Sequence, residues 1–589
     1  MDQKNLLLAI VLSAGIYLAF LYFFPQKPPV PATPPQQTSE GTQPGAPPAP
    51  GGATPSTPPL ASSAAQAAPR ATVLAETPRV GIDTPRLAGS INLVGGRIDD
   101  LTLVNYRETP EPDSPEIVLL APDKSEHPYF AEFGWVAGDS AVKTPGPDTR
   151  WTSSGGNLTP DHPIDLSWDN GAGLTFKRHF AVDRDYMFTV TQAVTNAGAA
   201  AVTLYPYALV ARKGEVPVSG TYLSHEGPIG VVDGTLHDGS FGDKFNYTDL
   251  EKGSQPEFAS TGGWIGFTDK YWLTALIPDQ KEQIKARLKF NDPQVKVYQA
   301  DYTGAEHALA PGATVTDDTR LFAGAKEVAL LDHYEQDPGV PKFDRAIDFG
   351  LFYWLTKPIF LTLDFFYKLI GNFGLAIMLL TFTIKLIFFP LANKSYVAMS
   401  KMKLLQPEMQ KLREKFGDDK AKLNQEMMAL YKKFGANPAA GCLPIVIQIP
   451  VFFSLYKVLY VTIEMRHAAF YGWIHDLSAP DPTSFINLFG LLPFAPPSFA
   501  LLHIGAWPII MGVTMFLQQK LNPQPPDPVQ AKMFMALPFV FTYMLSQFAS
   551  GLVIYWAWNN LLSIAQQWVI MRRAGVSRAK PPAKPVKTT

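Results

Sequence analysis

The chain of 589 residues has a single cysteine and few charged residues. Cys442 has no second cysteine to pair with, so an intrachain disulfide and a disulfide-built secreted module are both excluded. Charged residues make up 17% of the chain, against roughly 25% in an average soluble protein. The formal net charge is −2, which gives no indication of a nucleic-acid partner, and we expect no DNA partner.

The sequence also lacks the motifs that carry common enzyme chemistry. It has no phosphate-cradling loop, no zinc-type His/Glu pair, no nucleophile elbow and no dinucleotide fingerprint. The ten histidines are scattered, and His467 and His475, which flank an apolar run, are more readily interpreted as interfacial residues than as metal ligands. The sequence therefore predicts no enzyme, no cofactor, no catalytic residue and no metal site.

What the chain does have is six apolar runs near the length of about 20 residues that a helix needs to cross a bilayer. The run in 1–24 is followed by prolines and not by a small-x-small cleavage site, so we expect an uncleaved N-terminal anchor rather than a signal peptide.

The last two runs nearly touch, which predicts a tight turn at Ser550 and Gly551. The apolar stretch 488–500 is broken by prolines and is expected to dip into the interface as a loop. The five further spans are predicted at 371–390, 442–462, 501–520, 533–550 and 551–571.

The segment between the anchor and the second span has two parts. Residues 25–71 are rich in Pro and Ala and bury too little apolar surface to fold, so they are predicted to form a disordered linker. Residues 72–340 change to period-two alternation. Leu174–Gly198 and Gly262–Pro278 each alternate apolar and polar residues around a turn, at 183–185 and 268–270. Several such strands predict an all-β sandwich.

Helical spacing returns at 341–357. Phe343, Ile347, Leu351 and Trp354 share one helical face, which predicts an amphipathic helix on the membrane surface. A helix that faces an ordinary protein core is the alternative.

Basic residues set the expected orientation. The loop 391–440 has ten basic residues, and the tail 572–589 has six and no acid, whereas Glu464, Asp476 and Asp481 outnumber Arg466 in the loop after the third span. Cytoplasmic loops are enriched in Lys and Arg. Six spans with both termini in the cytoplasm satisfy this rule, and they put the β domain in the periplasm of a two-membrane bacterium.

The basic loop 391–440 is itself expected to be a helical hairpin. Met402, Leu405 and Met409 recur at helical spacing in its first half, as do Met427 and Leu430 in its second. Gly417 is predicted to stop the first helix and Asp419 to cap the second. The methionine-rich faces either pack on each other or bind varied apolar partners.

One charge lies inside a predicted span. Lys385 is in 371–390, where a central lysine costs about 2.5–3.5 kcal/mol on insertion scales. It either snorkels to the cytoplasmic headgroups or faces a wet groove. None of the five spans contains Asp or Glu, so an ammonium in a groove would have no partner within them. Polar residues in the spans suggest such a groove, although they could instead bond between helices: Thr381, Gln448, Thr514, Gln518, Thr542, Gln547, Asn559, Ser563, Gln566 and Gln567.

Several stretches resemble the YidC family of membrane protein insertases of two-membrane bacteria, which is related to mitochondrial and chloroplast insertases. The resemblance covers nearly the whole length. It begins with "MDQKNLLLAI" and is most specific in Pro390–Leu459, in "WIHDLSAPDP" (Trp473–Pro482), in "MGVTMFLQQKLNP" (Met511–Pro523) and in "SGLVIYWAWNNLLSIAQQ" (Ser550–Gln567).

The resemblance implies a polytopic α-helical membrane protein with a five-helix insertase core, a cytoplasmic hairpin and a periplasmic β-supersandwich. The family's groove has a basic residue, commonly arginine, and Lys385 stands at that position. Thr381 and Gln448 match groove-lining positions, and Tyr555 and Trp556 fall where the family often has two substrate-contacting aromatics. With the polar Gln518, these six residues form the candidate substrate groove.

The implied function is insertion and assembly of integral membrane proteins in the inner membrane, alone or with the Sec translocon. The expected partners are nascent membrane proteins, Sec components, the ribosome near the hairpin and basic tail, and the lipid bilayer. A secondary transporter is an alternative, but it would usually need intramembrane carboxylates. A membrane-anchored periplasmic binding protein is another, but it leaves five spans unexplained.

Overall fold

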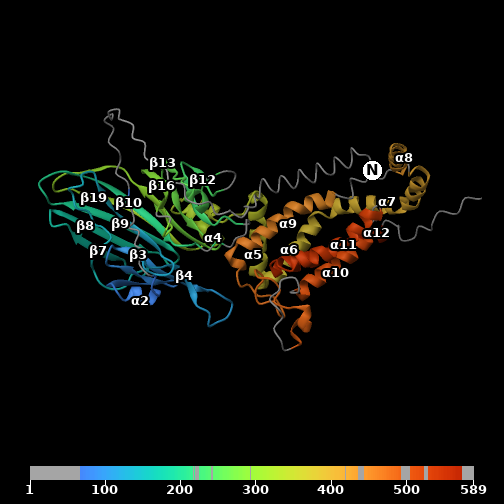
Figure 1. The fold of residues 1–589 in the computed structure, drawn as a ribbon, viewed down its shortest axis with the longest axis horizontal. Helices are drawn as coiled ribbons and strands as arrows, with labels where there is room; N and C mark the ends of the chain where they lie inside the picture. Colours follow the sequence, from blue (N-terminus) through green and yellow to red (C-terminus); the bar gives the residue numbers. More distant parts are fainter. Residues whose placement is uncertain are drawn as a thin grey trace, which may run out of the picture. The chain divides into compact units, whose positions relative to one another are not determined.

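The computed structural model in Figure 1 describes residues 67–216, 224–239, 245–291, 294–417, 419–434, 443–492, 504–522 and 528–573, with 57, 218 and 243 as single residues. These residues fall into two compact units, one that ends at Ile347 and one that begins at Asp348. The expected anchor at 1–24, most of the linker 25–71, part of the stretch 488–500 and the tail beyond Arg573 lie outside the described residues.

The first unit consists of two antiparallel sheets. The ten-stranded sheet has the order β1 (Arg79–Asp83), β2 (Leu87–Asn92), β3 (Arg97–Arg107), β5 (Tyr129–Ala137), β10 (Val202–Lys213), β17 (Val297–Thr303), β16 (Gln283–Asn291) and β13 (Glu257–Thr261), with β4 (Glu116–Leu120) paired to β3 and β18 (His307–Leu309) to β10. The nine-stranded sheet has the order β12 (Thr235–His237), β11 (Gly227–Val232), β14 (Trp264–Thr268), β15 (Trp272–Pro278), β19 (Thr314–Ala325), β9 (Met187–Asn196), β8 (Leu174–Val182), β7 (Ile164–Asp169) and β6 (Thr152–Ser153).

The period-two pattern produces these sheets as the sequence predicts. In β8, Leu174, Phe176 and Phe180 are buried, whereas the intervening Lys177 and His179 are exposed. Successive side chains of a strand point to opposite faces, so one face of β8 joins the core. The two hairpins expected around 183–185 and 268–270 are confirmed as β8–β9 and β14–β15. The sandwich is therefore confirmed. Three short helices accompany it: α2 (Arg70–Leu74), α3 (Tyr247–Glu251) and α4 (Val328–Gln336).

One carboxyl group of the sandwich should make its stability depend on pH. Burial raises the pKa of Asp317, on β19, to about 7, and Glu282 and Asp318 act in the same direction. The folded unit therefore holds a proton that the unfolded chain releases, so it loses stability as the pH rises from about 4 to about 7.

Replacing Asp317 by Asn should remove this loss. We expect the variant to exceed the parent chain in unfolding free energy at pH 8, by about 4 kcal/mol as an upper limit, and to match it near pH 4. Hydrogen exchange of peptides from β19 in the full chain measures the difference at both pH values. A gap of the same size at pH 4 and pH 8 would contradict the assignment.

The amphipathic helix predicted at 341–357 is wrong as drawn. Residues 343–346 form a single 3-10 turn, and Phe343 is fully buried in the β unit, where its ring packs on those of Trp264 and Phe322. Gly350 then adopts a φ of 73°, which ends helical geometry. A helix begins only at Tyr353. The apolar spacing runs across this break only by coincidence of position, because Phe343 and Ile347 pack in the β core whereas Trp354 belongs to the helix that follows.

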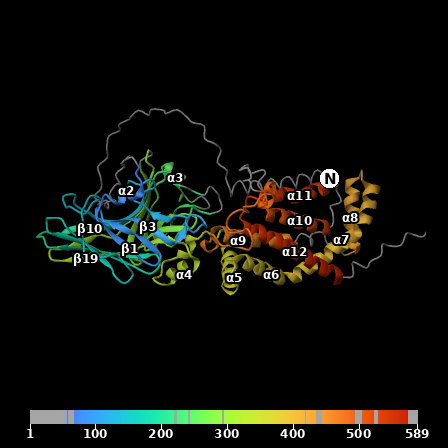
Figure 2. The same ribbon diagram turned by 90° about the horizontal axis from the view of Figure 1, so that it is seen from below.

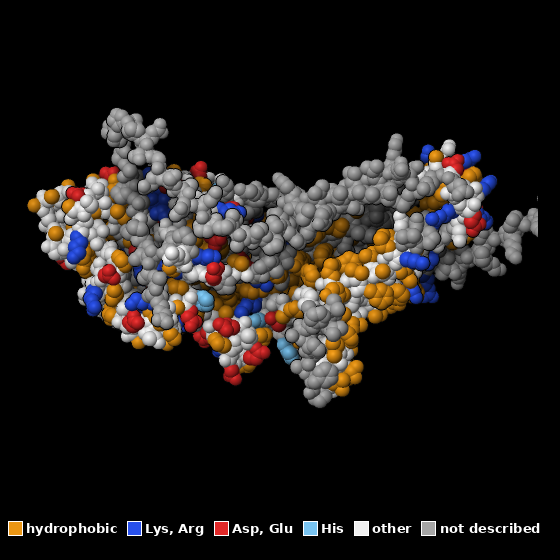
Figure 3. Space-filling view, in the orientation of Figure 1, with side chains coloured by type: hydrophobic (Ala, Val, Ile, Leu, Met, Phe, Trp, Pro, Cys, Tyr) orange, Lys and Arg blue, Asp and Glu red, His pale blue; other side chains and the backbone are white. Residues whose placement is uncertain are grey.

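The second unit is helical (Figure 2). Its helices are α5 (Tyr353–Ile370), α6 (Phe373–Ile387), α7 (Phe389–Phe416), α8 (Lys420–Phe434), α9 (Leu443–Val461), α10 (Ala506–Leu521), α11 (Pro528–Leu545) and α12 (Ser550–Arg573), with 3-10 turns at Ile463–Met465 and Phe485–Gly490. The helix α5 packs against α6 and α9, α12 packs against α6 and α10, and α10 packs against α11. Hydrophobic side chains cover much of the visible face of this unit in Figure 3, while Lys and Arg side chains gather at the end that holds α7 and α8.

Judged by length and hydropathy, no described helix qualifies alone as a membrane span. The helices α6 and α7 qualify only as a pair, and they bend by 68° between Ile387 and Phe389. The shorter segment Val446–Val461 of α9 is predominantly apolar.

The turn predicted at Ser550 and Gly551 is also misplaced. The connection occupies residues 546–549, and Ser550 is already the first residue of α12. The Ser550 hydroxyl and backbone N–H both donate to the carbonyl oxygen of Ala479, and the Gly551 N–H donates to that of Leu477. These carbonyls satisfy N–H groups that a helix start would otherwise leave unpaired, so α12 begins at Ser550.

The hairpin formed by α7 and α8 has its own small core. Leu405 and Met409 of α7 are buried against Met427 and Leu430 of α8. The backbone N–H of Lys422 donates to the Asp419 carboxylate, so the predicted cap of the second helix is confirmed. Of the two interpretations of the methionine-rich faces, packing on each other accounts for these four residues.

Candidate functional site

The strongest candidate site is a small pocket where four helices of the second unit meet. It encloses about 40 Å³. The helix α6 contributes one wall, the start of α7 a second, α9 a third and α12 the fourth. The lining residues are Ile384, Lys385, Phe388, Leu391, Ala392, Tyr396, Ile447, Gln448, Val451 and Gln566.

Lys385 points into the unit rather than along α6 toward its end. Its ammonium donates a hydrogen bond of 2.8 Å to the Ser563 hydroxyl on α12. That hydroxyl in turn donates to the backbone carbonyl of Asn559, so its oxygen is free to accept from the lysine. No described carboxylate forms an ion pair with Lys385. The pocket therefore has a positive charge that a hydroxyl group solvates and that no described carboxylate neutralises.

A second polar group lies on the α9 wall. The Gln448 amide donates to the Tyr555 hydroxyl at 2.6 Å and to the side-chain oxygen Oδ1 of Asn559 at 3.4 Å. Tyr555 is buried, and its neighbour Asn559 lies one helical turn further along α12. Asn559, Ser563 and Gln566, three of the polar residues that suggested a groove, lie at helical spacing on α12 and form a polar stripe. Gln566 lines the pocket, and Ser563 and Asn559 accept hydrogen bonds from the pocket residues Lys385 and Gln448.

The other predicted site residues lie elsewhere. Thr381 is buried and its hydroxyl donates back to the Ile377 carbonyl of its own helix. Gln518, on α10, does not line the pocket. Trp556 follows Tyr555 but turns toward α9 and α11, where its ring lies 4.8 Å from that of Phe452 and 5.9 Å from that of Phe541. The structure therefore brings Lys385, Gln448 and Tyr555 together, and separates Gln518 and Trp556 from them.

Other polar side chains of α12 form hydrogen bonds to neighbouring helices instead. The Asn560 amide donates to the Thr514 hydroxyl, which joins α12 to α10, and the Trp558 indole donates to the Met378 carbonyl on α6. Both expected uses of polar residues, lining and interhelical bonding, thus occur in α12.

Two interacting residues of the helical unit could not be singled out from the sequence. Tyr396, one of the pocket-lining residues, belongs to the first turns of α7, and its hydroxyl interacts with Ser563. Lys457 of α9 makes a 2.8 Å ion pair with Asp348, before α5. Lys457 stands near the end of an apolar run, but its partner Asp348 is more than a hundred residues away in the sequence, so the pair could not be predicted. Tyr396 had no local signal, because a tyrosine in an amphipathic helix is unremarkable.

Comparison with known proteins agrees with this architecture. Residues 79–362 match the family model "YidC periplasmic domain", and residues 365–577 match the model "60Kd inner membrane protein". A Methylobacterium radiotolerans protein named membrane protein insertase YidC is 51% identical over 98% of this chain and 96% of its own length. A Granulibacter bethesdensis protein of the same name is 51% identical over 98% of this chain and 99% of its own. Among solved structures, an active YidC insertase aligns with 83% of this chain and 91% of its own at 17% identity, with a TM-score of 0.35.

Proposed function

The chain belongs to the YidC family and is a membrane protein insertase of the bacterial inner membrane; from this premise we propose that the Lys385 pocket receives its substrates. The contact between the Lys385 ammonium and Ser563 is the observation that carries the proposal. It holds a positive charge between helices with no described carboxylate beside it, and such a charge attracts an acidic group that arrives from outside.

The membrane arrangement is also part of the proposal. We propose that the 1–24 anchor, α6, α9, α10, α11 and α12 cross the membrane as six spans. The hairpin and both termini then lie in the cytoplasm, with the β sandwich in the periplasm. The ten basic residues of 391–440 against five acids, and the acid-free tail, support this orientation. The exposed apolar row Trp354, Leu361, Phe365 and Leu369 supports placement of α5 at the membrane surface.

In the mechanism that we propose, a short hydrophilic tail of a nascent protein enters from the cytoplasm and its acidic groups meet Lys385. The following apolar segment passes along α9 and α11 into lipid. Burial of about 20 apolar residues drives this step, so no nucleotide is required. The ribosome near the hairpin and the Sec translocon are proposed partners.

Reconstitution tests the proposal. Proteoliposomes that contain only the full chain should insert a small single-span substrate whose translocated tail becomes protected from protease. Solute flux without insertion would instead support the transporter alternative. Empty vesicles and vesicles with heat-denatured chain control for spontaneous insertion.

The hairpin should contribute to the rate of insertion. Replacing Met399–Phe434 by a short Gly/Ser linker removes a basic surface that can meet ribosomal RNA or anionic lipid. We expect the initial rate of insertion to fall severalfold at an equal amount of chain. A protease-protection time course measures it.

A matched variant separates charge from scaffold. Replacing Lys432 and Lys433 by Gln, in the last turn of α8, keeps the hairpin core and removes two charges. If this variant shows part of the loss in insertion rate that the hairpin replacement shows, the positive charge of the hairpin surface contributes to insertion. Unchanged rates in the deletion itself would mean that the hairpin has no part in insertion under these conditions.

A further inference from the structure

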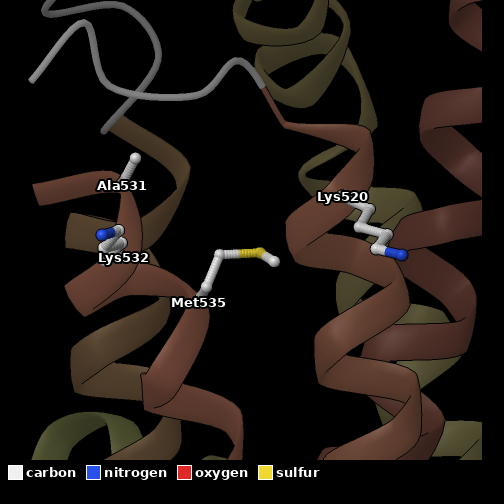
Figure 4. Close-up of a pocket in the computed structure, with 4 residues that line it drawn as sticks. All are labelled: Lys520, Ala531, Lys532 and Met535. Carbon is white, nitrogen blue, oxygen red and sulfur yellow. The ribbon is translucent and has the colours of Figure 1, made fainter. Parts of the chain in front are cut away.

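The helical unit has a second groove, between α10 and α11. Its volume is about 540 Å³, and it is lined by Lys520, Ala531, Lys532 and Met535. It shares no lining residue with the Lys385 pocket. Figure 4 shows Met535 pointing from α11 into the gap toward α10, with the two ammonium groups at the outer edges. The groove therefore has an apolar centre and a cation on each side.

Specific contacts hold the two helices together beside this groove. The Gln519 amide of α10 donates to the Phe534 carbonyl of α11 at 3.1 Å. The rings of Phe516 and Phe539 lie 6.2 Å apart, and the Lys520 ammonium lies 4.7 Å from the centre of the Phe516 ring. These contacts place aromatic surface directly against one of the two cations.

Exposed apolar side chains extend the groove along both helices. Val513 and Leu517 precede Lys520 at helical spacing and are 54% and 49% exposed. On α11, Phe539 follows Met535 by one turn and is 69% exposed. A ligand that fits must thus combine an anionic group at the lysines with a long apolar part along these rows.

The local charge favours an anion strongly. Between Ile504 and Arg573 the described residues include no Asp or Glu, whereas Lys520, Lys532, Arg572 and Arg573 are all basic. Asp527, between the two helices in the sequence, lies outside the described residues; among the described residues of this stretch, no carboxylate pairs with either lysine.

We propose that the α10–α11 groove binds an anionic phospholipid, with its phosphate at Lys520 and Lys532 and an acyl chain along Leu517, Met535 and Phe539. Basic pockets between membrane helices on the cytoplasmic side bind such headgroups. A nucleic acid would use the lysines but not the apolar rows. The proposal rests on the proposed membrane placement, which puts this end of the helices at the cytoplasmic headgroups.

Native mass spectrometry of the full chain in detergent tests it, with phosphatidylglycerol and zwitterionic phosphatidylcholine as probes. Each lysine near an anionic lipid contributes about fivefold to binding, so Lys520→Gln with Lys532→Gln should weaken retention of phosphatidylglycerol about 25-fold. Replacing both by Arg should preserve it, because the charge persists. Lys177→Gln with Lys281→Gln, a charge-matched control on two exposed lysines of the β unit, should leave it unchanged.

Three results would overturn the proposal. The Gln variant could retain phosphatidylglycerol as the parent does. Soluble glycerol phosphate could displace the lipid, which would show a site for free phosphate. An RNA oligonucleotide could displace it, which would show a nucleic-acid site. Photoactivatable phosphatidylglycerol should also label peptides of α10 and α11 in the parent chain, which checks the location without any variant.

Lipid retention is measured without substrate, so it separates this proposal from the proposed function. Loss of insertion with retention intact would count against the Lys385 mechanism alone. Insertion with no specific retention would count against the lipid site alone.

Discussion

Replacing Lys385 by glutamate should reduce insertion of substrates with acidic translocated tails more than any other single change in the pocket. The substitution turns an attraction into a repulsion beside Ser563, where no described carboxylate balances it. Two unit charges about 6 Å apart at an effective dielectric constant near 20 interact by under 3 kcal/mol before desolvation is subtracted. The loss should therefore be graded: up to about 100-fold where the attraction is only removed, as in Lys385→Gln, and larger where glutamate turns it into a repulsion.

A variant series identifies the charge as the cause. Lys385→Arg should be tolerated, Lys385→Gln should be intermediate, and Ser563→Ala should have a small effect, because it removes the hydroxyl partner but keeps the ammonium. The measurement is insertion efficiency at equal expression, with one substrate whose tail carboxylates are present or neutralised. Substrates with neutral tails should be nearly insensitive to all four variants. If Arg, Gln and Glu insert both substrates equally well, Lys385 has no electrostatic role.

The sequence predicted the local elements well and the non-local ones poorly. Period-two alternation in Leu174–Asn196 gave a hairpin because the strands are adjacent and one face is buried. The pairing of β5 with β10 was not predictable, because strands β6 to β9 of the other sheet lie between them in the sequence. The helix expected at 341–357 failed for a related reason. Phe343 packs in the sandwich, and only tertiary structure shows where an apolar stripe changes its partner.

The candidate site follows the same division. Lys385 was predicted from a local signal, a charge in an apolar run, and that signal is independent of the fold. Its hydroxyl partner is Ser563. The sequence shows that Ser563 is a polar residue of the last span, but it does not show which other helix that residue faces. Trp556 shows the limit of a pattern carried over from relatives, because adjacent helical residues point about 100° apart and only Tyr555 faces Gln448.

Removing the Glu132 carboxylate should strongly destabilise the β unit without impairing insertion. Glu132 is buried on β5, where it accepts a 2.6 Å hydrogen bond from Arg97 and a 2.8 Å bond from the Tyr207 hydroxyl. Arg178 belongs to the same cluster. Its guanidinium donates to the carbonyls of Gly95 and Gly96, and burial lowers its pKa to about 10. Arg97 also forms a 3.7 Å ion pair with Asp123, so Glu132 is the closer of its two carboxylates and the one that also acts on Arg178.

In Glu132→Ala both guanidinium groups would remain buried without that carboxylate. Breaking a buried pair in this way costs about 3–5 kcal/mol, so hydrogen exchange in β5 and β10 of the full chain should accelerate by a factor of about 100 or more. Asp165→Ala is the matched control, because it removes a carboxylate from the exposed pair with His179, where the cost is under about 1 kcal/mol. Insertion should be nearly unchanged in both variants, since every residue that lines the Lys385 pocket lies beyond Asp348. Slower insertion by Glu132→Ala at equal chain levels, with Asp165→Ala normal, would mean that the folded β unit takes part in insertion.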